Sequence, residues 1–187
     1  MTRTLVLGGA RSGKSAYAER LASLAHDTGT EVVYIATATA GDSEMAARIA
    51  HHRAGRPSQW ATVEEPLALG SALLHWCSPE RLVLVDCLTL WLTNLLFDGT
   101  EHPEVGALTL PAHFYQQQAL LADALARCPG DIVLVSNETG LGLTPMGALS
   151  RCFVDEQGRL NQAMAALCDR AVFVAAGLPL FLKGGPC

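Results

Sequence analysis

A glycine-rich segment near the amino end has the residue types and spacing of a phosphate-binding loop. Residues 8–15 read GGARSGKS and match the pattern GxxxxGK[ST]. In this pattern the glycines let backbone N–H groups turn toward phosphates, the lysine neutralises the outer phosphates, and the serine hydroxyl binds Mg²⁺. We therefore expect nucleoside triphosphate binding, with Lys14 in a catalytic role and Ser15 as a metal ligand. The expected nucleotide-binding residues here are Gly8, Gly9, Ala10, Arg11, Ser12, Gly13, Lys14 and Ser15.

A second metal-binding group is expected at the end of a neighbouring strand, because a phosphate loop shares its magnesium ion with an acid. The apolar run 81–86 (RLVLVD) ends in Asp86. An acid that ends a buried strand is also common as a cap of the following helix, and this alternative stays open. Beside the phosphate loop, the favoured role of Asp86 is to bind Mg²⁺ and the nucleotide.

Two adjacent histidines lie on an expected amphipathic helix, residues 42–53. Helical spacing puts His52 on the apolar side with Met45 and Ile49, whereas His51 falls on the polar side. A neutral imidazole nitrogen can attack phosphorus, and His51 is the better placed of the two to face solvent or a ligand. A capping or surface role for both histidines is the alternative.

The elements that would position these residues alternate between apolar strands and helices. Such alternation, with strands that are apolar on both faces, predicts an α/β fold whose mostly parallel sheet carries helices on both faces. The irregular segment 99–106 allows no prediction, and 137–145 is expected to be a glycine-rich loop. Strands are expected at 3–7, 31–36, 81–86, 131–136 and, as the last strand, 171–175; helices are expected at 14–25, 42–54, 66–78, 88–97, 111–128 and 147–168.

Composition limits the class of protein. The 187 residues are 50% hydrophobic, which suits one domain spanning 1–187. The net charge of −5 is interspersed, so nucleic-acid binding has no electrostatic support. The six cysteines form no CxxC pair, which favours reduced thiols over a zinc site or a disulfide framework. With no signal-peptide core and no apolar run long enough to span a bilayer, we expect a cytoplasmic protein without a membrane span.

Five segments taken together resemble one family. They are GGARSGKS at 8–15, YIATATA at 34–40, EMAARIAHHRAGRP at 44–57, DCLT at 86–89 and SNETGLGLTP at 136–145. The chain resembles, over nearly its whole length, the bifunctional adenosylcobinamide kinase and adenosylcobinamide-phosphate guanylyltransferase family of cobalamin biosynthesis. The HHR element is a more specific mark of this family than the phosphate loop.

The resemblance implies two uses of nucleotide. In the first, the γ-phosphate of ATP or GTP passes to the hydroxyl of the aminopropanol arm of adenosylcobinamide. In the second, a histidine attacks the α-phosphorus of GTP, expels pyrophosphate and holds GMP until the substrate's phosphate displaces it, which yields adenosylcobinamide-GDP. The resemblance places the attacking histidine at His51.

The resemblance also implies further site residues, a P-loop NTPase fold with a RecA-like sheet, and a homotrimer. It leaves both direct and water-mediated contact of Asp86 with the metal open, because relatives can carry the longer glutamate there. The residues that it places around the guanine nucleotide are Ala36, Thr37, Ala38, His52, Arg53, Ala54, Gly55 and Glu64.

Several points stay open at this stage. Glu138 and Asp155 are candidate general bases for the kinase step, although surface or capping roles suit either residue. The loop 137–142 could approach the corrinoid or a neighbouring subunit, or serve as a plain strand-to-helix turn. A small-molecule kinase with two structural histidines is the main rival function. A GTP-dependent switch is disfavoured because the NKxD element that reads guanine in such proteins is absent.

Overall fold

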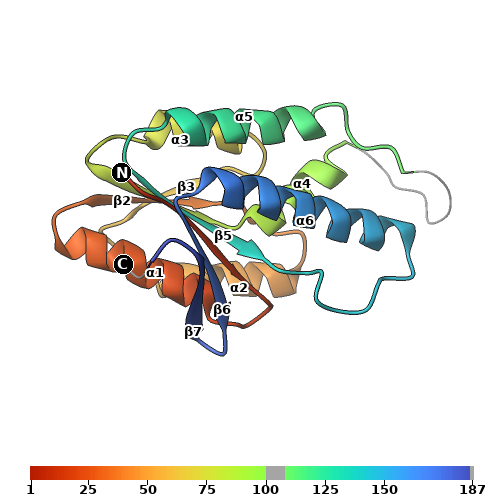
Figure 1. Ribbon diagram of the computed structural model, residues 1–187, viewed down its shortest axis with the longest axis horizontal. Coiled ribbons are helices and arrows are strands. Elements are labelled where there is room, and N and C mark those ends of the chain that lie inside the picture. Colours follow the sequence, from red (N-terminus) through yellow and green to blue (C-terminus); the bar gives the residue numbers. More distant parts are fainter. Residues whose placement is uncertain (100–107, 186–187) are drawn as a thin grey trace.

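The structure is a computed structural model that describes residues 1–99 and 108–185, except for the side chains of residues 48, 51 and 52 (Figure 1). Residues 100–106 therefore lie outside the described residues. They belong to the irregular segment 99–106, for which the sequence allowed no prediction. Across the part of the chain that is described, no helix is both long and apolar enough to cross a membrane.

A seven-stranded sheet forms the centre of the molecule, in the order β3-β2-β4-β5-β1-β6-β7. Six strands run parallel, and the edge strand β7 runs antiparallel to β6. This arrangement confirms the predicted α/β fold with a mostly parallel sheet. The strands are β1 Arg3–Gly8, β2 Glu31–Ala36, β3 Ala61–Glu64, β4 Arg81–Asp86, β5 Asp131–Asn137, β6 Arg170–Ala175 and β7 Leu178–Lys183.

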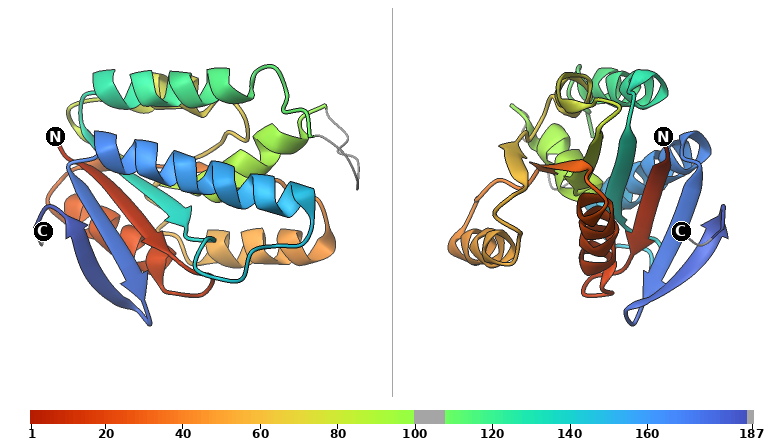
Figure 2. Two further views of the ribbon diagram at one scale, coloured as in Figure 1. Left: turned by 45° about the vertical axis from the view of Figure 1, so that its right-hand side comes forward. Right: turned by 90° about the vertical axis from the view of Figure 1, so that its left-hand side faces the viewer.

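Helices cover both faces of the sheet (Figures 1 and 2). Because successive strand residues point to opposite faces, Leu5 and Leu7 of β1 pack with α3, α4, α5 and α6, whereas Val6 packs with α1. The central strands are therefore apolar on both sides, as a buried parallel sheet requires. The helices are α1 Lys14–Asp27, α2 Ser43–Ala54, α3 Leu69–Trp76, α4 Leu88–Phe97, α5 Phe114–Arg127 and α6 Ala148–Leu167.

The interior elements agree with the sequence predictions, and the edges do not. The strands 31–36 and 81–86 and the helix 88–97 have the predicted bounds. The expectation that 171–175 is the last strand is wrong, because β7 follows β6 through a tight turn in which Ala176 and Gly177 have positive φ values of 51° and 77°. Two residues with positive φ favour a hairpin turn between antiparallel strands.

Strand β3 and the start of α3 also differ from the prediction. Three of the four residues of β3 are exposed, so this edge strand lacks the apolar pattern of a buried one. Helix α3 begins at Leu69 rather than near residue 66, because a Glu65 carboxylate oxygen accepts hydrogen bonds from the N–H groups of Leu67 and Ala68 at 2.9 and 2.7 Å.

The carboxyl ends of the central parallel strands meet at one edge of the sheet. Strand register pairs Gly8 of β1 with Asn137 of β5, and Ala36 of β2 with Asp86 of β4. In open parallel sheets, ligands bind at this edge. The phosphate loop and the acid that were found separately in the sequence are thereby brought to the same place.

Candidate active site

The phosphate loop curls tightly between β1 and α1. Arg11 and Gly13 take left-handed backbone conformations, with φ of 56° and 94°. A Cβ atom on Gly8 would lie 2.4 Å from the Ser12 Oγ atom and 2.5 Å from the Val174 carbonyl oxygen, so only glycine fits there. These constraints explain why the motif needs glycine at both ends.

Polar groups inside the loop suit an anionic ligand. The Lys14 ammonium donates a hydrogen bond to the Gly9 carbonyl oxygen at 3.1 Å. The Ser12 hydroxyl is buried and has no hydrogen-bond partner among the described residues. Helix α1 begins directly after Gly13, so its amino end faces the loop and favours negative charge. The loop is thus suited to phosphate groups.

A cavity of about 220 Å³ opens beside the loop. It brings together residues from α1, α2, β2, β3, β4 and β5, which lie far apart in the sequence. The sequence-predicted residues that line it are Lys14, Ser15, Ala36, Ala38, Arg53, Glu64 and Asp86.

The donor set at this cavity fits a magnesium ion. Mg²⁺ prefers oxygen ligands, and the Ser15 hydroxyl and the Asp86 carboxylate line the same space. The alternative role of Asp86 as a helix cap is not what the structure shows, because α4 begins after Cys87 without any side-chain cap hydrogen bond. The Asp86 carboxylate instead accepts a hydrogen bond from the Tyr34 hydroxyl at 2.9 Å.

Tyr34 and Arg56 belong to the site although the sequence did not single them out. The Arg56 guanidinium lies 3.5 Å from the centre of the Tyr34 ring, and both residues line the cavity. Burial, followed by the neighbouring Asp86, raises the pKa of Tyr34, so its hydroxyl stays a donor to the carboxylate. The Nε and Nη1 atoms of Arg56 are buried without a hydrogen-bond partner among the described residues, which leaves donors available to an anion.

Helix α2 turns one side toward the cavity. Met45, Ile49 and Arg53, spaced four residues apart, all line it. This is the side that sequence spacing marked as apolar, and not the polar side that was expected to face solvent or a ligand. His51 and His52 belong to the same helix, but their side chains lie outside the described residues, so their roles stay predictions.

Arg53 forms an ion pair with Glu64 at the edge of this cavity. Both side chains are more than half exposed, so the pair contributes little stability. Either charge can therefore exchange its partner for a ligand.

Residues 8–13 of the phosphate loop do not line the cavity, although Lys14 and Ser15 do. Outside the loop, the predicted nucleotide-binding residues Thr37, Ala54 and Gly55 do not line it either. The Thr37 side chain is fully buried, and its hydroxyl bonds the Cys87 carbonyl oxygen at 2.7 Å and the Cys87 N–H at 2.9 Å. It fixes the turn after β4. Ala54 and Gly55 are exposed at the end of α2. Nucleotide contacts of these three residues stay predictions.

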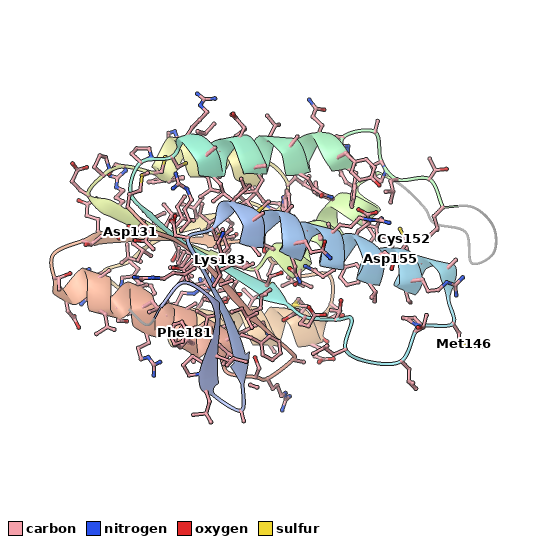
Figure 3. The ribbon with its side chains drawn as sticks, viewed as in Figure 1. Asp131, Met146, Cys152, Asp155, Phe181 and Lys183 are labelled. Atoms are coloured by element: carbon pink, nitrogen blue, oxygen red, sulfur yellow. The ribbon has the colours of Figure 1, made fainter. Side chains whose placement is uncertain are left out.

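The two candidate general bases lie apart from the cavity as the described residues define it. A Glu138 carboxylate oxygen accepts a hydrogen bond from the Gly140 N–H at 2.6 Å, which stabilises a turn. Asp155 lies on α6 (Figure 3). With Arg151 it lines a separate hollow. Asn137, by contrast, lines the phosphate-loop cavity. The place of Asn137 directly after the apolar run 131–136 is only a partial sequence signal, because its pairing with Gly8 is set by strand register.

Comparison with solved structures supports the fold. The chain is similar to the flagellar accessory protein FlaH from Methanocaldococcus jannaschii, with a TM-score of 0.53 over 97% of this chain and 78% of that one. Only 12% of the residues are identical, so this likeness concerns the fold alone.

Comparison with known sequences is more specific. The chain is 53% identical over 184 residues to the bifunctional adenosylcobalamin biosynthesis protein CobP of Pseudomonas aeruginosa, covering 98% of this chain and 99% of that one. It is 43% identical over 183 residues to the bifunctional adenosylcobalamin biosynthesis protein CobU of Escherichia coli, covering 96% and 98%. The family model for cobinamide kinase / cobinamide phosphate guanyltransferase matches residues 4–182. With its phosphate loop, acid and histidine helix in place, the chain belongs to the cobinamide kinase / cobinamide phosphate guanyltransferase family.

Proposed function

We propose that this enzyme phosphorylates adenosylcobinamide with ATP or GTP and then transfers GMP from GTP through a covalent adduct on His51, which forms adenosylcobinamide-GDP. The observation that carries the proposal is the shared cavity. Lys14, Ser15 and Asp86 line it from the sheet side, and Met45 and Ile49 line it from α2, the helix that contains His51. Two nucleotide reactions can thereby use the same phosphate loop and the cavity beside it.

In the first step the loop N–H groups and Lys14 hold the outer phosphates. The substrate hydroxyl attacks the γ-phosphorus, the bond from this phosphorus to the β-phosphate oxygen breaks, and a nucleoside diphosphate leaves. Ser15 and Asp86 would hold Mg²⁺, which neutralises phosphate charge when bound. The protein's contribution is to position the reactants and to stabilise charge.

In the second step the nucleophile belongs to the protein. A ring nitrogen of His51 attacks the α-phosphorus of GTP, the bond to the β-phosphate oxygen breaks, and pyrophosphate leaves. An oxygen of the substrate's new phosphate then attacks the same phosphorus and frees the histidine. Both steps need the triphosphate charge neutralised by Lys14, and they differ in which phosphorus faces the nucleophile.

Incubation with GTP labelled at the α-phosphate, followed by denaturation, tests the covalent step. We expect the wild type to keep an acid-labile, base-stable label and His51→Ala to lose it. His75→Ala is the matched control, because His75 is exposed on α3, away from the cavity. An unlabelled wild type would overturn the proposal and favour the rival reading, a small-molecule kinase without guanylyl transfer.

The proposed homotrimer is supported by exposed apolar side chains on the loop before α6. Leu141, Leu143 and Met146 are 80%, 98% and 96% exposed, and Met146 lies at the outer end of this loop (Figure 3). Several exposed apolar side chains on one loop are typical of an interaction surface. Sedimentation should show a trimer for the wild type and smaller species for Leu143→Asp. A monomeric wild type would contradict this assembly.

We also propose a cytoplasmic location. The cysteines that the structure describes are free thiols, and such thiols are typical of a reducing compartment.

A further inference from the structure

The Asn137 side chain lies in the phosphate-loop cavity with Lys14, Ser15 and Asp86, and the mechanism above gives it no role. Its strand, β5, lies between β4, which ends in Asp86, and β1, which leads into the loop. Asn137 is the last residue of β5 and pairs in register with Gly8, the first residue of the loop. It therefore lies between the two groups expected to hold the outer phosphates and their metal.

The main chain around Asn137 is held from several sides. The Asn137 N–H donates to the Thr89 hydroxyl at 2.8 Å, and its carbonyl oxygen accepts from the Asn161 side-chain amide at 3.0 Å. The next N–H group, of Glu138, donates to the Gly8 carbonyl oxygen at 3.1 Å. These bonds fix the point from which the Asn137 side chain projects.

A buried polar network on α6 supports this arrangement. The Asn161 side-chain oxygen accepts hydrogen bonds from the Ser136 hydroxyl at 2.7 Å and from the Gln157 amide at 3.1 Å. Ser136 and Gln157 are fully buried, and Asn161 is nearly so. Hydrogen bonds among buried side chains restrain their positions, although the Gln157 Oε1 atom has no partner among the described residues. Asn137 is thus preorganised rather than held in a mobile loop.

The side-chain oxygen of Asn137 has no hydrogen-bond partner in the part of the chain that the structure describes. This Oδ1 atom is buried as well. A buried acceptor left unsatisfied costs about 1–3 kcal/mol, so a bound ligand that supplies a donor is favoured. Phosphate oxygens are acceptors and do not fill this need. The hydroxyl of the kinase substrate is a donor.

We propose that the Asn137 Oδ1 atom accepts a hydrogen bond from the substrate hydroxyl. This bond directs the hydroxyl oxygen toward the γ-phosphorus. This inference rests on the kinase step of the proposed function. An amide takes up no proton at neutral pH, so the hydroxyl proton passes to a non-bridging oxygen of the transferred phosphoryl group as the new O–P bond forms. Amide side chains orient nucleophiles in this way in other phosphate-loop enzymes.

The proposal separates the two reactions. The nucleophile of the guanylyl step is the ring of His51, which does not need Asn137. Removal of the Asn137 acceptor should therefore slow phosphoryl transfer and spare the labelling of His51. Three other possible partners of this amide are the Lys14 ammonium, a metal-held water and a phosphate oxygen. All three belong to both reactions, so their loss would slow both.

The test compares Asn137→Ala with Asn137→Asp, which keeps an acceptor oxygen in nearly the same place. For Asn137→Ala we expect kcat for cobinamide phosphorylation to fall about 100-fold, the cost of a misplaced reactant, with KM for ATP nearly unchanged. Labelling by α-labelled GTP should stay within about twofold of the wild type, and this measurement also shows that the variant is folded. Asn137→Asp should keep clearly more phosphorylation activity than Asn137→Ala.

Three results would overturn the assignment: equal loss of both reactions in Asn137→Ala, unchanged phosphorylation in that variant, or no advantage of Asn137→Asp over it. If Asn137→Ala does not fold, Asn137→Leu, which also removes the acceptor oxygen, decides the point through the same ratio of the two rates. A wild type that phosphorylates no cobinamide would instead refute the kinase step of the proposed function, and this outcome needs no variant.

Discussion

Lys14 is a side chain that both reactions need, because the triphosphate must be neutralised whichever phosphorus is attacked. We expect Lys14→Ala to lower cobinamide phosphorylation and protein guanylylation each by about 100-fold or more, as the loss of a key electrostatic donor does. His51→Ala should abolish guanylylation and leave phosphorylation nearly intact. Rates of both half-reactions, measured on each purified variant, check this division. Equal loss of both activities in folded His51→Ala would contradict it.

Tyr34 acts on the site through Asp86. Tyr34→Phe removes the hydrogen bond that orients the Asp86 carboxylate but keeps the buried ring under Arg56. Since partners of metal ligands tune metal affinity, the Mg²⁺ concentration for half-maximal activity should rise about tenfold.

A titration of phosphorylation activity with MgCl₂ measures this effect. Tyr115→Phe is the control, because Tyr115 is exposed on α5 and its hydroxyl bonds Glu156 instead. An unchanged magnesium requirement in Tyr34→Phe would show that Asp86 does not depend on this bond.

At the scale of elements, α3 and α5 pack closely at Gly70. A Cβ atom there would lie 2.7 Å from the backbone carbonyl carbon and oxygen of Leu120. Gly70→Ala should therefore lower the free energy of unfolding by about 1–3 kcal/mol, although alanine is the better helix former.

Gly158→Ala is the matched experiment on α6, because nothing lies within 4 Å of a Cβ atom at that position. There the higher helix propensity of alanine should decide the result, and the free energy of unfolding should rise by up to about 1 kcal/mol. Urea denaturation of both variants measures the difference. A stabilised Gly70→Ala would mean that the two helices separate easily.

The sequence predicted best those elements that the sheet buries on both sides. The runs 31–36 and 81–86 are continuous apolar strands because helices cover both of their faces. Strands β3 and β7 lie at the edges of the sheet with largely exposed residues, so burial imposes no such pattern on them.

The candidate site could be predicted where a local motif defines it and not where strand register does. Lys14 and Ser15 follow from one short pattern. The place of Asn137 depends on its pairing with Gly8, more than a hundred residues away in the chain. Arg56 lines the cavity because the chain folds back over Tyr34 after α2, which spacing along the sequence does not reveal.

For the whole molecule, buried thiols predict a loss of stability at alkaline pH. Burial chiefly raises the pKa of Cys87, Cys128 and Cys168 to about 12, from an ordinary value of 9.0. Above pH 9 the unfolded chain loses protons that the folded chain keeps, so stability falls as pH rises toward 12.

From pH 8 to pH 10 we expect these three thiols to lower the free energy of unfolding by roughly 3–4 kcal/mol, about a third of it from each thiol. Urea denaturation at both pH values measures the fall. Cys168→Ala should reduce the size of this fall by about a third, whatever it does to stability at pH 8. An unchanged pH dependence in that variant would show that Cys168 does not contribute.

The turn between β6 and β7 touches the phosphate loop. The Gly177 N–H donates to the Ser12 carbonyl oxygen at 2.8 Å, and the Gly177 Cα atom would lie 3.0 Å from a Cβ atom on Gly13. At the other end of β7, the Lys183 ammonium bonds the carbonyl oxygens of Ala165 and Ala166 in the last turn of α6 (Figure 3). Deletion of residues 178–183 would therefore act as a mutation of the nucleotide site.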